Sequence, residues 1–172
     1  MYPPKLQRII TFFESLPPGE IRAVLISYAG RVKNFLPPEG MEMDFVDMRK
    51  DAECEDKVGV YLKFDAEGHV SFYVETGPNV QTLTNALACI LCEGLSGEKP
   101  ETVEALTHDF VPRIVGGQLF RQRSQTVYYV LRRMKEAVKM HRDGLRRAAI
   151  AEAKADSCEC NTGGETGGSC AS

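Results

Sequence analysis

Apolar residues recur at helical spacing in two stretches near the start of the chain. The first stretch predicts a helix over residues 5–15, with an inward stripe of Leu6, Ile9, Ile10 and Phe13. The second predicts a single helix over residues 20–35, with a stripe of Ile21, Val24, Leu25, Tyr28 and Val32. Proline and glycine clusters bound the second helix, at Pro17, Pro18 and Gly19 before it and at Pro37, Pro38 and Gly40 after it.

The pattern then changes to the short, apolar-rich runs that are typical of strands. Residues 58–64 and 69–75 predict two strands, and a short strand is expected at 44–48. The four residues from Asp65 to Gly68 fit a hairpin turn, because glycine adopts a positive φ without strain. These strands therefore predict a small antiparallel sheet.

Helical spacing returns in the second half of the chain. Residues 80–95 predict a helix with one apolar face, formed by Leu83, Leu87, Ile90, Leu91 and Gly94. Pro100 suits the first turn of a short helix that runs to residue 108. A long helix is expected from about residue 122 to 155, with Val127, Val130, Leu131, Met134 and Val138 facing inward. The order of elements predicts an α+β fold, a small antiparallel sheet packed against helices on one face.

Length and composition favour one domain with a tail. The 172 residues are 43% hydrophobic, which is enough to bury a core. We expect the domain to span residues 1–145, and residues 146–172 to form the helix end and a flexible, cysteine-containing tail rich in Gly, Ser and Thr. No apolar run approaches the roughly 18 residues that cross a bilayer, and the start does not resemble a signal peptide. A soluble, cytoplasmic protein with no membrane partner is expected.

Charge is distributed unevenly along the chain. Residues 1–120 carry 11 Lys and Arg against 18 Asp and Glu, whereas residues 121–172 carry 10 against 6. The long helix is the basic element, through Arg132, Arg133, Lys135, Lys139, Arg142, Arg146 and Arg147. An interaction module that binds nucleic acid or an acidic partner is therefore one alternative. The helix lacks an interleaved aromatic pattern, and we place most of its charges opposite the apolar stripe, so nucleic acid is not the expected partner.

Cys54 is the most informative of the six cysteines. It lies in a polar segment between a helical region and the hairpin, where an exposed loop is expected. A cysteine reacts as its thiolate, which Glu53, Glu55 and Asp56 disfavour. Arg49, Lys50 and Lys57 favour the thiolate, so the two sets of neighbours roughly cancel.

The remaining cysteines point less clearly to chemistry. Cys89 and Cys92 fall in the middle of a helix, where a redox pair lacks the support of a helix N-terminus, so semi-buried packing residues are expected. Cys158, Cys160 and Cys170 lie in the tail without the spacing of a zinc knuckle. The histidines His69, His108 and His141 are scattered, and no ligand cluster is expected. Neither a metal nor a cofactor is predicted.

The order of these elements resembles the SufE family over roughly residues 5–140. A helical pair precedes a single loop cysteine, and a hairpin, the TLTNALACILCEGLSG helix and a last long helix opened by Arg-Ser-Gln follow. The resemblance implies that Cys54 is the sulfur-accepting residue and that Arg123 lies near the sulfur site. Around the cysteine the family reads Gly-Cys-x-Ser-x-Val-Trp, and this chain keeps only Cys54 and Val58. Beyond about residue 145 the chain has no counterpart in the family pattern.

The resemblance also implies a function. A cysteine desulfurase similar to SufS, which itself uses pyridoxal phosphate, would transfer persulfide sulfur to Cys54. The sulfur would then pass to a scaffold similar to SufBCD for iron–sulfur cluster assembly. The chain would act as a persulfide carrier that stimulates the desulfurase rather than as a stand-alone enzyme. A cysteine hydrolase or peroxidase is the remaining alternative, and it needs a base or resolving partner that the sequence does not identify.

Overall fold

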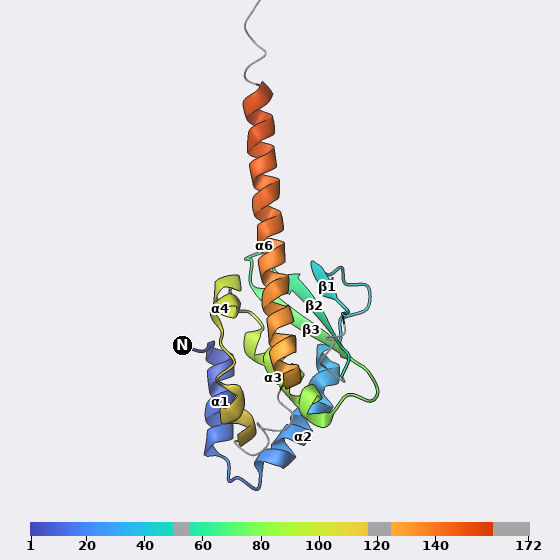
Figure 1. Ribbon diagram of the computed structural model, residues 1–172, viewed down its shortest axis with the longest axis vertical. Helices are drawn as coiled ribbons and strands as arrows, with labels where there is room; N and C mark the ends of the chain where they lie inside the picture. The colour runs from blue at the N-terminus through green and yellow to red at the C-terminus, as the bar shows by residue number, and fades with distance from the viewer. Residues whose placement is uncertain (50–55, 117–124, 160–172) are drawn as a thin grey trace, which may run out of the picture. The chain divides into compact units, whose positions relative to one another are not determined.

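The computed structural model describes residues 1–49, 56–116 and 125–159 (Figure 1). The chain divides into two compact units, Met1–Lys139 and Met140–Ser172. The first unit holds the three-stranded sheet and the helices that pack on it. Its elements confirm the predicted α+β class.

Two helices and a short 3-10 turn open the first unit. Helix α1 covers Pro4–Ser15, helix α2 covers Ile21–Arg31, and the 3-10 helix η1 covers Val32–Phe35. The predicted stripe of α1 is confirmed, because Leu6, Ile9, Ile10 and Phe13 are all buried. The prediction of one helix over residues 20–35 is wrong at its end, where the last turn tightens into η1 before Pro37 and Pro38.

The sheet is antiparallel and ordered β1-β2-β3. Strand β1 is Phe45–Asp47, shorter than the expected 44–48, and strands β2 and β3 are Val58–Phe64 and Val70–Thr76. Asp47 pairs with Val60. Val58 pairs with Thr76, so the end of β1, the start of β2 and the end of β3 share one end of the sheet. The turn between β2 and β3 relies on Gly68, whose φ of 82° is the predicted positive value.

Helix α3, Thr82–Leu95, is the most deeply buried element of the first unit. It packs against α1 and α2 on one side and against β3 on the other (Figure 1). The single apolar face expected from the sequence is therefore too narrow, since partners surround the helix. A Cβ added at Gly94 would lie 3.1 Å from the Cβ of Leu6, so this glycine allows α1 to approach closely.

The remaining helices complete the core. Helix α4 covers Pro100–Ala105, which is shorter than expected, and residues 111–116 are also helical. Helix α6 covers Gln125–Glu159. Its predicted inward residues are confirmed, because each is at most 4% exposed: Val127, Val130, Leu131, Met134 and Val138. The helix ends four residues later than predicted, because its alanine-rich stretch from residue 148 to 155 has high helix propensity.

The second unit consists, in its described part, of the last turns of α6. From Arg142 to Ile150 every side chain is exposed. The disorder predicted for residues 158–172 is wrong at its start, because Cys158 and Glu159 belong to this helix. Cys160 and Cys170 lie outside the described residues. No helix in the described ranges is both long and apolar enough to cross a bilayer.

Candidate functional site

Both predicted site residues, Cys54 and Arg123, lie outside the described residues. Their neighbours in the chain define the site. Cys54 belongs to the connection that leaves β1 after Asp47 and enters β2 at Val58, at the end of the sheet where β3 also ends. Arg123 precedes the first residue of α6, Gln125, by two positions. The site is therefore described from the two flanks of the Cys54 connection and from α6.

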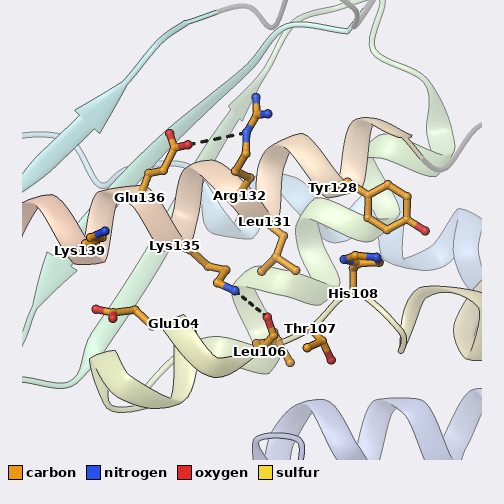
Figure 2. Close-up of a pocket in the computed structure, with 10 residues that line it drawn as sticks. All are labelled: Glu104, Leu106, Thr107, His108, Tyr128, Leu131, Arg132, Lys135, Glu136 and Lys139. Atoms are coloured by element: carbon orange, nitrogen blue, oxygen red, sulfur yellow. Dashed lines mark hydrogen bonds and ion pairs between the residues drawn. The ribbon is translucent and has the colours of Figure 1, made fainter.

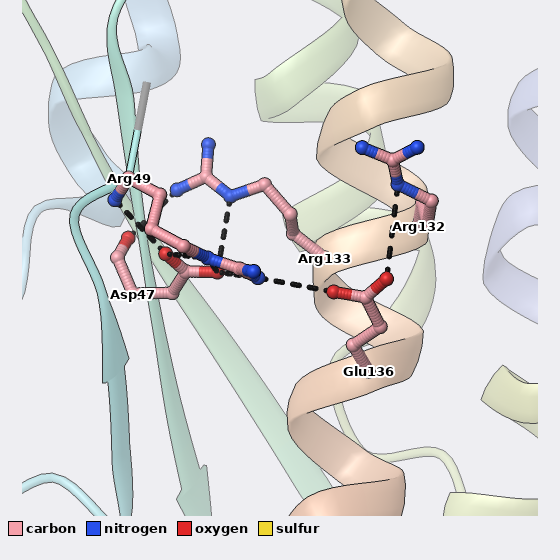
Figure 3. Close-up of polar contacts among 5 residues, drawn as sticks. All are labelled: Asp47, Arg49, Arg132, Arg133 and Glu136. Atoms are coloured by element: carbon pink, nitrogen blue, oxygen red, sulfur yellow. Dashed lines mark hydrogen bonds and ion pairs between the residues drawn. The ribbon is translucent and has the colours of Figure 1, made fainter. Parts of the chain in front are cut away.

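Asp47 joins the flank before Cys54 to helix α6. Its carboxylate accepts hydrogen bonds from the Arg49 backbone N–H at 2.9 Å and from the Arg49 guanidinium at 2.6–3.0 Å. Arg133 of α6 donates to the Asp47 carboxylate at 3.2 Å and to its backbone oxygen at 2.7 Å. The side chains of Asp47 and Arg133 are each only 3% exposed, so this ion pair is buried (Figure 3).

A second carboxylate extends this network along α6. Glu136 accepts from Arg49 at 3.0 Å and pairs with Arg132 at 3.7 Å (Figure 3). We call these five residues the Asp47 cluster: Asp47, Arg49, Arg132, Arg133 and Glu136. Within it three guanidinium groups face two carboxylates. Arg49, whose side chain is 64% exposed, lies five positions before Cys54 in the sequence.

The protonation of Asp47 follows from these contacts. Burial by itself would raise the pKa of the Asp47 carboxyl group. Hydrogen bonds from Arg49 and Arg133 outweigh the burial and hold this pKa well below its usual range. The Arg49 guanidinium is stabilised in turn, and its pKa is raised by Asp47 and then by Glu136. Asp47 therefore remains a fixed anion that orients two arginines.

Asp56 anchors the flank after Cys54. Its side chain, in a residue only 7% exposed, accepts hydrogen bonds from the Thr84 hydroxyl and, at 3.3 Å, from the Gln81 backbone N–H. Gln81 is the N-cap of α3, and a carboxylate is favoured there by the positive end of the helix dipole. The Cys54 connection is thus fastened to β1 and α6 on one side and to α3 on the other.

Neither anchor, the Asp47 cluster or Asp56, was predicted from the sequence. The sequence places most basic residues of the last helix opposite its apolar stripe, but Arg133, one of that set, is buried and only 2% exposed. A signal was present in the spacing, since position 133 shares the stripe formed by Val130, Met134 and Ala137. Asp47 and Asp56 carried no comparable signal, because their partners lie 86 and 28 positions away in the chain.

The cysteine pair of α3 is more deeply buried than expected. Cys89 and Cys92 are both free and fully buried, rather than semi-buried. Burial, opposed only in part by Arg31, raises the pKa of the Cys89 thiol to about 11. Burial raises the pKa of Cys92 as well. Both thiols are packing residues of the core, and neither is suited to accept sulfur.

We expect Cys89 and Cys92 to resist alkylation in the folded chain. At pH 8 a thiol with a pKa of about 11 is ionised to roughly 0.1%, and burial also excludes the reagent. Iodoacetamide should label both at least about 100-fold more slowly than in urea, as measured by peptide mass spectrometry. Equal rates in the two conditions would show that α3 opens readily.

A group of potential metal ligands occurs in the hairpin turn, where none was expected. One ligand atom each from Asp65, Glu67 and His69 lies within 4.8 Å of the others. Asp65 already accepts hydrogen bonds from the backbone N–H groups of Glu67 and His69 and pairs with the His69 ring at 3.1 Å. These contacts account for the arrangement as a turn motif.

The first unit is similar to proteins of a known family. The sequence matches the SufE family, described as an Fe-S metabolism associated domain, over residues 7–138. No curated protein matches the chain. The chain is also similar to the solution structure of a hypothetical protein from Thermus thermophilus, with 30% identity and a TM-score of 0.67. That similarity covers 82% of this chain and 98% of the Thermus chain.

Proposed function

Because the chain belongs to the SufE family of Fe-S metabolism associated domains, we propose that it is a cytoplasmic sulfur carrier for iron–sulfur cluster assembly. Cys54 takes persulfide sulfur from a cysteine desulfurase and delivers it to a cluster scaffold. The observation that carries this proposal is the family match, which spans both Cys54 and Arg123. The acceptor domain covers residues 1–145, and residues 146–172 form the helix end and tail.

The proposed transfer is a displacement at sulfur. The Cys54 thiolate attacks the terminal sulfur of a persulfide on the desulfurase cysteine. A new sulfur–sulfur bond forms on Cys54 while the old bond breaks, and the desulfurase cysteine leaves as a thiolate. The exchange needs no external oxidant or reductant, because it follows the course of thiol–disulfide exchange. Pyridoxal phosphate belongs to the desulfurase, and its chemistry precedes this step.

The described flanks support this role electrostatically. The acidic neighbours Glu53 and Glu55 disfavour a thiolate at Cys54. The Asp47 cluster holds three arginines, and one of them, Arg49, lies at the start of the same connection. A nearby guanidinium lowers the pKa of a thiol and stabilises a thiolate leaving group. The described anchors, at Asp47 and at Asp56, hold the two flanks of the connection that contains Cys54.

The direct test is a measurement of mass. The reduced chain is incubated with a desulfurase of the SufS type and free cysteine, and the intact protein is then analysed by mass spectrometry. We expect a gain equal to one sulfur atom, removed by dithiothreitol and mapped to the peptide with Cys54. Reactions without free cysteine serve as the control. A chain that neither gains sulfur nor stimulates the desulfurase would contradict the proposal.

Arg123→Ala is expected to slow sulfur transfer more than it weakens binding of the desulfurase. The resemblance places Arg123 near the sulfur site, where a permanent positive charge would favour the Cys54 thiolate. The alkylation rate of Cys54 is measured against pH, together with desulfurase affinity, and its midpoint should move to higher pH. Arg22→Ala, at an exposed position of α2, is the matched control. An unchanged pH profile in Arg123→Ala would remove Arg123 from the mechanism and leave Cys54 in place.

A further inference from the structure

A groove lies between helix α6 and the segment that contains α4 and the residues following it. Its volume is about 540 Å³, and its walls come from both elements (Figure 2). We call it the α4–α6 groove. It is lined by Glu104, Leu106, Thr107, His108, Tyr128, Leu131, Arg132, Lys135, Glu136 and Lys139. All of these residues belong to the first unit.

The groove combines an apolar base with a charged rim. Leu106 and Leu131 lie at the base and are each 4% exposed. Beside them the His108 and Tyr128 rings pack edge to face, with 4.6 Å between the ring centroids. Lys135 closes part of the base by donating to the Leu106 backbone oxygen at 2.9 Å (Figure 2). Such a site suits a ligand with an apolar side chain and polar flanks.

The positive charges of the rim lie along the wall formed by α6. Arg132, Lys135 and Lys139 follow the helical spacing of three and four on α6, so they form a row beside the groove. Glu136 lies in the same row and Glu104 on the opposite wall. Three cations and two carboxylates among these lining residues leave one positive charge in excess.

The length of the groove indicates the form of the ligand. Tyr128 and Lys139 lie eleven positions apart on α6, which corresponds to about 16 Å along a helix that rises 1.5 Å per residue. An extended peptide rises about 3.3 Å per residue, so about five residues span this distance. Glu104 and Glu136 interrupt the positive charges of the rim, so the groove suits a short segment with a few carboxylates better than a continuous polyanion such as nucleic acid.

We propose that the α4–α6 groove binds an extended, net acidic peptide segment of a partner protein. One apolar side chain of the segment packs against the His108 and Tyr128 rings above Leu106 and Leu131, and its carboxylates face Lys135 and Lys139. The interaction needs no thiol, so it can be tested in a chain that lacks Cys54. The groove also shares Glu136 and Arg132 with the Asp47 cluster, and Glu136 accepts a hydrogen bond from Arg49.

The test uses the full chain and two fluorescein-labelled hexapeptides with a central Leu-Phe pair. One carries Asp and Glu on both sides of that pair, and the other carries Lys. Fluorescence anisotropy should show tighter binding of the acidic peptide, weakened by salt. Amide shifts in ¹⁵N NMR spectra should concentrate at Thr107, His108 and Leu131.

Lys139→Glu should lower the affinity for the acidic peptide about three- to tenfold and raise the affinity for the lysine peptide. Reversing a rim charge changes the binding free energy by about 1 kcal/mol. Lys33→Glu makes the same charge change at an exposed position of η1, outside the groove, and should have no effect. Equal affinity for both peptides, or amide shifts elsewhere, would overturn the proposal. A single-stranded oligonucleotide provides the last comparison. If it displaces the peptide, and if Lys139→Glu weakens its own binding, the groove binds nucleic acid and the proposal is wrong.

Discussion

Cys54→Ser is expected to reduce desulfurase stimulation to the level of the desulfurase alone and to remove the gain of one sulfur. A serine hydroxyl is essentially un-ionised at neutral pH, and oxygen does not replace the thiolate that attacks a persulfide sulfur. The substitution is nearly isosteric, so the fold should persist. The measurements are the rate of cysteine desulfuration, the intact mass after incubation, and the melting temperature.

A tail variant provides the matched control. Cys158→Ser, Cys160→Ser and Cys170→Ser combined remove three further thiols and leave Cys54 in place. This triple variant should keep the stimulation and the sulfur gain of the unmodified chain. Full stimulation by Cys54→Ser would end the relay hypothesis, and its loss in the tail variant alone would move the acceptor to the tail.

Asp47→Asn is expected to destabilise the fold by about 3–5 kcal/mol, the usual cost of leaving one partner of a buried ion pair without its counter-charge. The asparagine preserves the shape of the side chain but removes the charge that faces Arg133, whose side chain is buried. It also leaves Arg49 bonded only to a neutral amide and to Glu136. Urea denaturation followed by circular dichroism measures the loss.

The effect of Asp47→Asn should depend on pH. The pKa of Asp47 is lowered in the folded state, so its contribution is complete above the unfolded value of about 4 and is lost as pH falls toward the folded value. The stability difference between the two proteins should therefore be constant from about pH 6 to 8 and should shrink below about pH 4.

Glu39→Gln serves as the control for both the loss of stability and its pH dependence. Glu39 is exposed, and neutralising it should change stability by less than about 0.5 kcal/mol at any of these pH values. A loss of under about 1 kcal/mol in Asp47→Asn at pH 7 would mean that the Asp47 cluster is not a structural anchor. A loss that grows as the pH falls would contradict the assigned ionisation of Asp47.

The sequence by itself determined the elements and most of their inward faces. The spacing of apolar residues and the positions of proline and glycine are local properties of the sequence. They predicted the buried stripes of α1 and α6, the two long strands and the turn at Gly68. The family resemblance came from the same information, namely the order of elements, one loop cysteine and the Arg-Ser-Gln start of the last helix. The assignments of Cys54 and Arg123 rest on that resemblance and remain predictions.

Only the tertiary structure decided which side chains meet. The burial of Cys89 and Cys92 depends on α3 having partners on several sides, which periodicity within one helix does not encode. The ion pair of Asp47 with Arg133 joins residues 86 positions apart. A charged residue is predicted to lie on the surface, because its burial requires a counter-charge. When that counter-charge is distant in the sequence, the local pattern does not reveal it. The α4–α6 groove likewise exists only because two separate segments pack side by side.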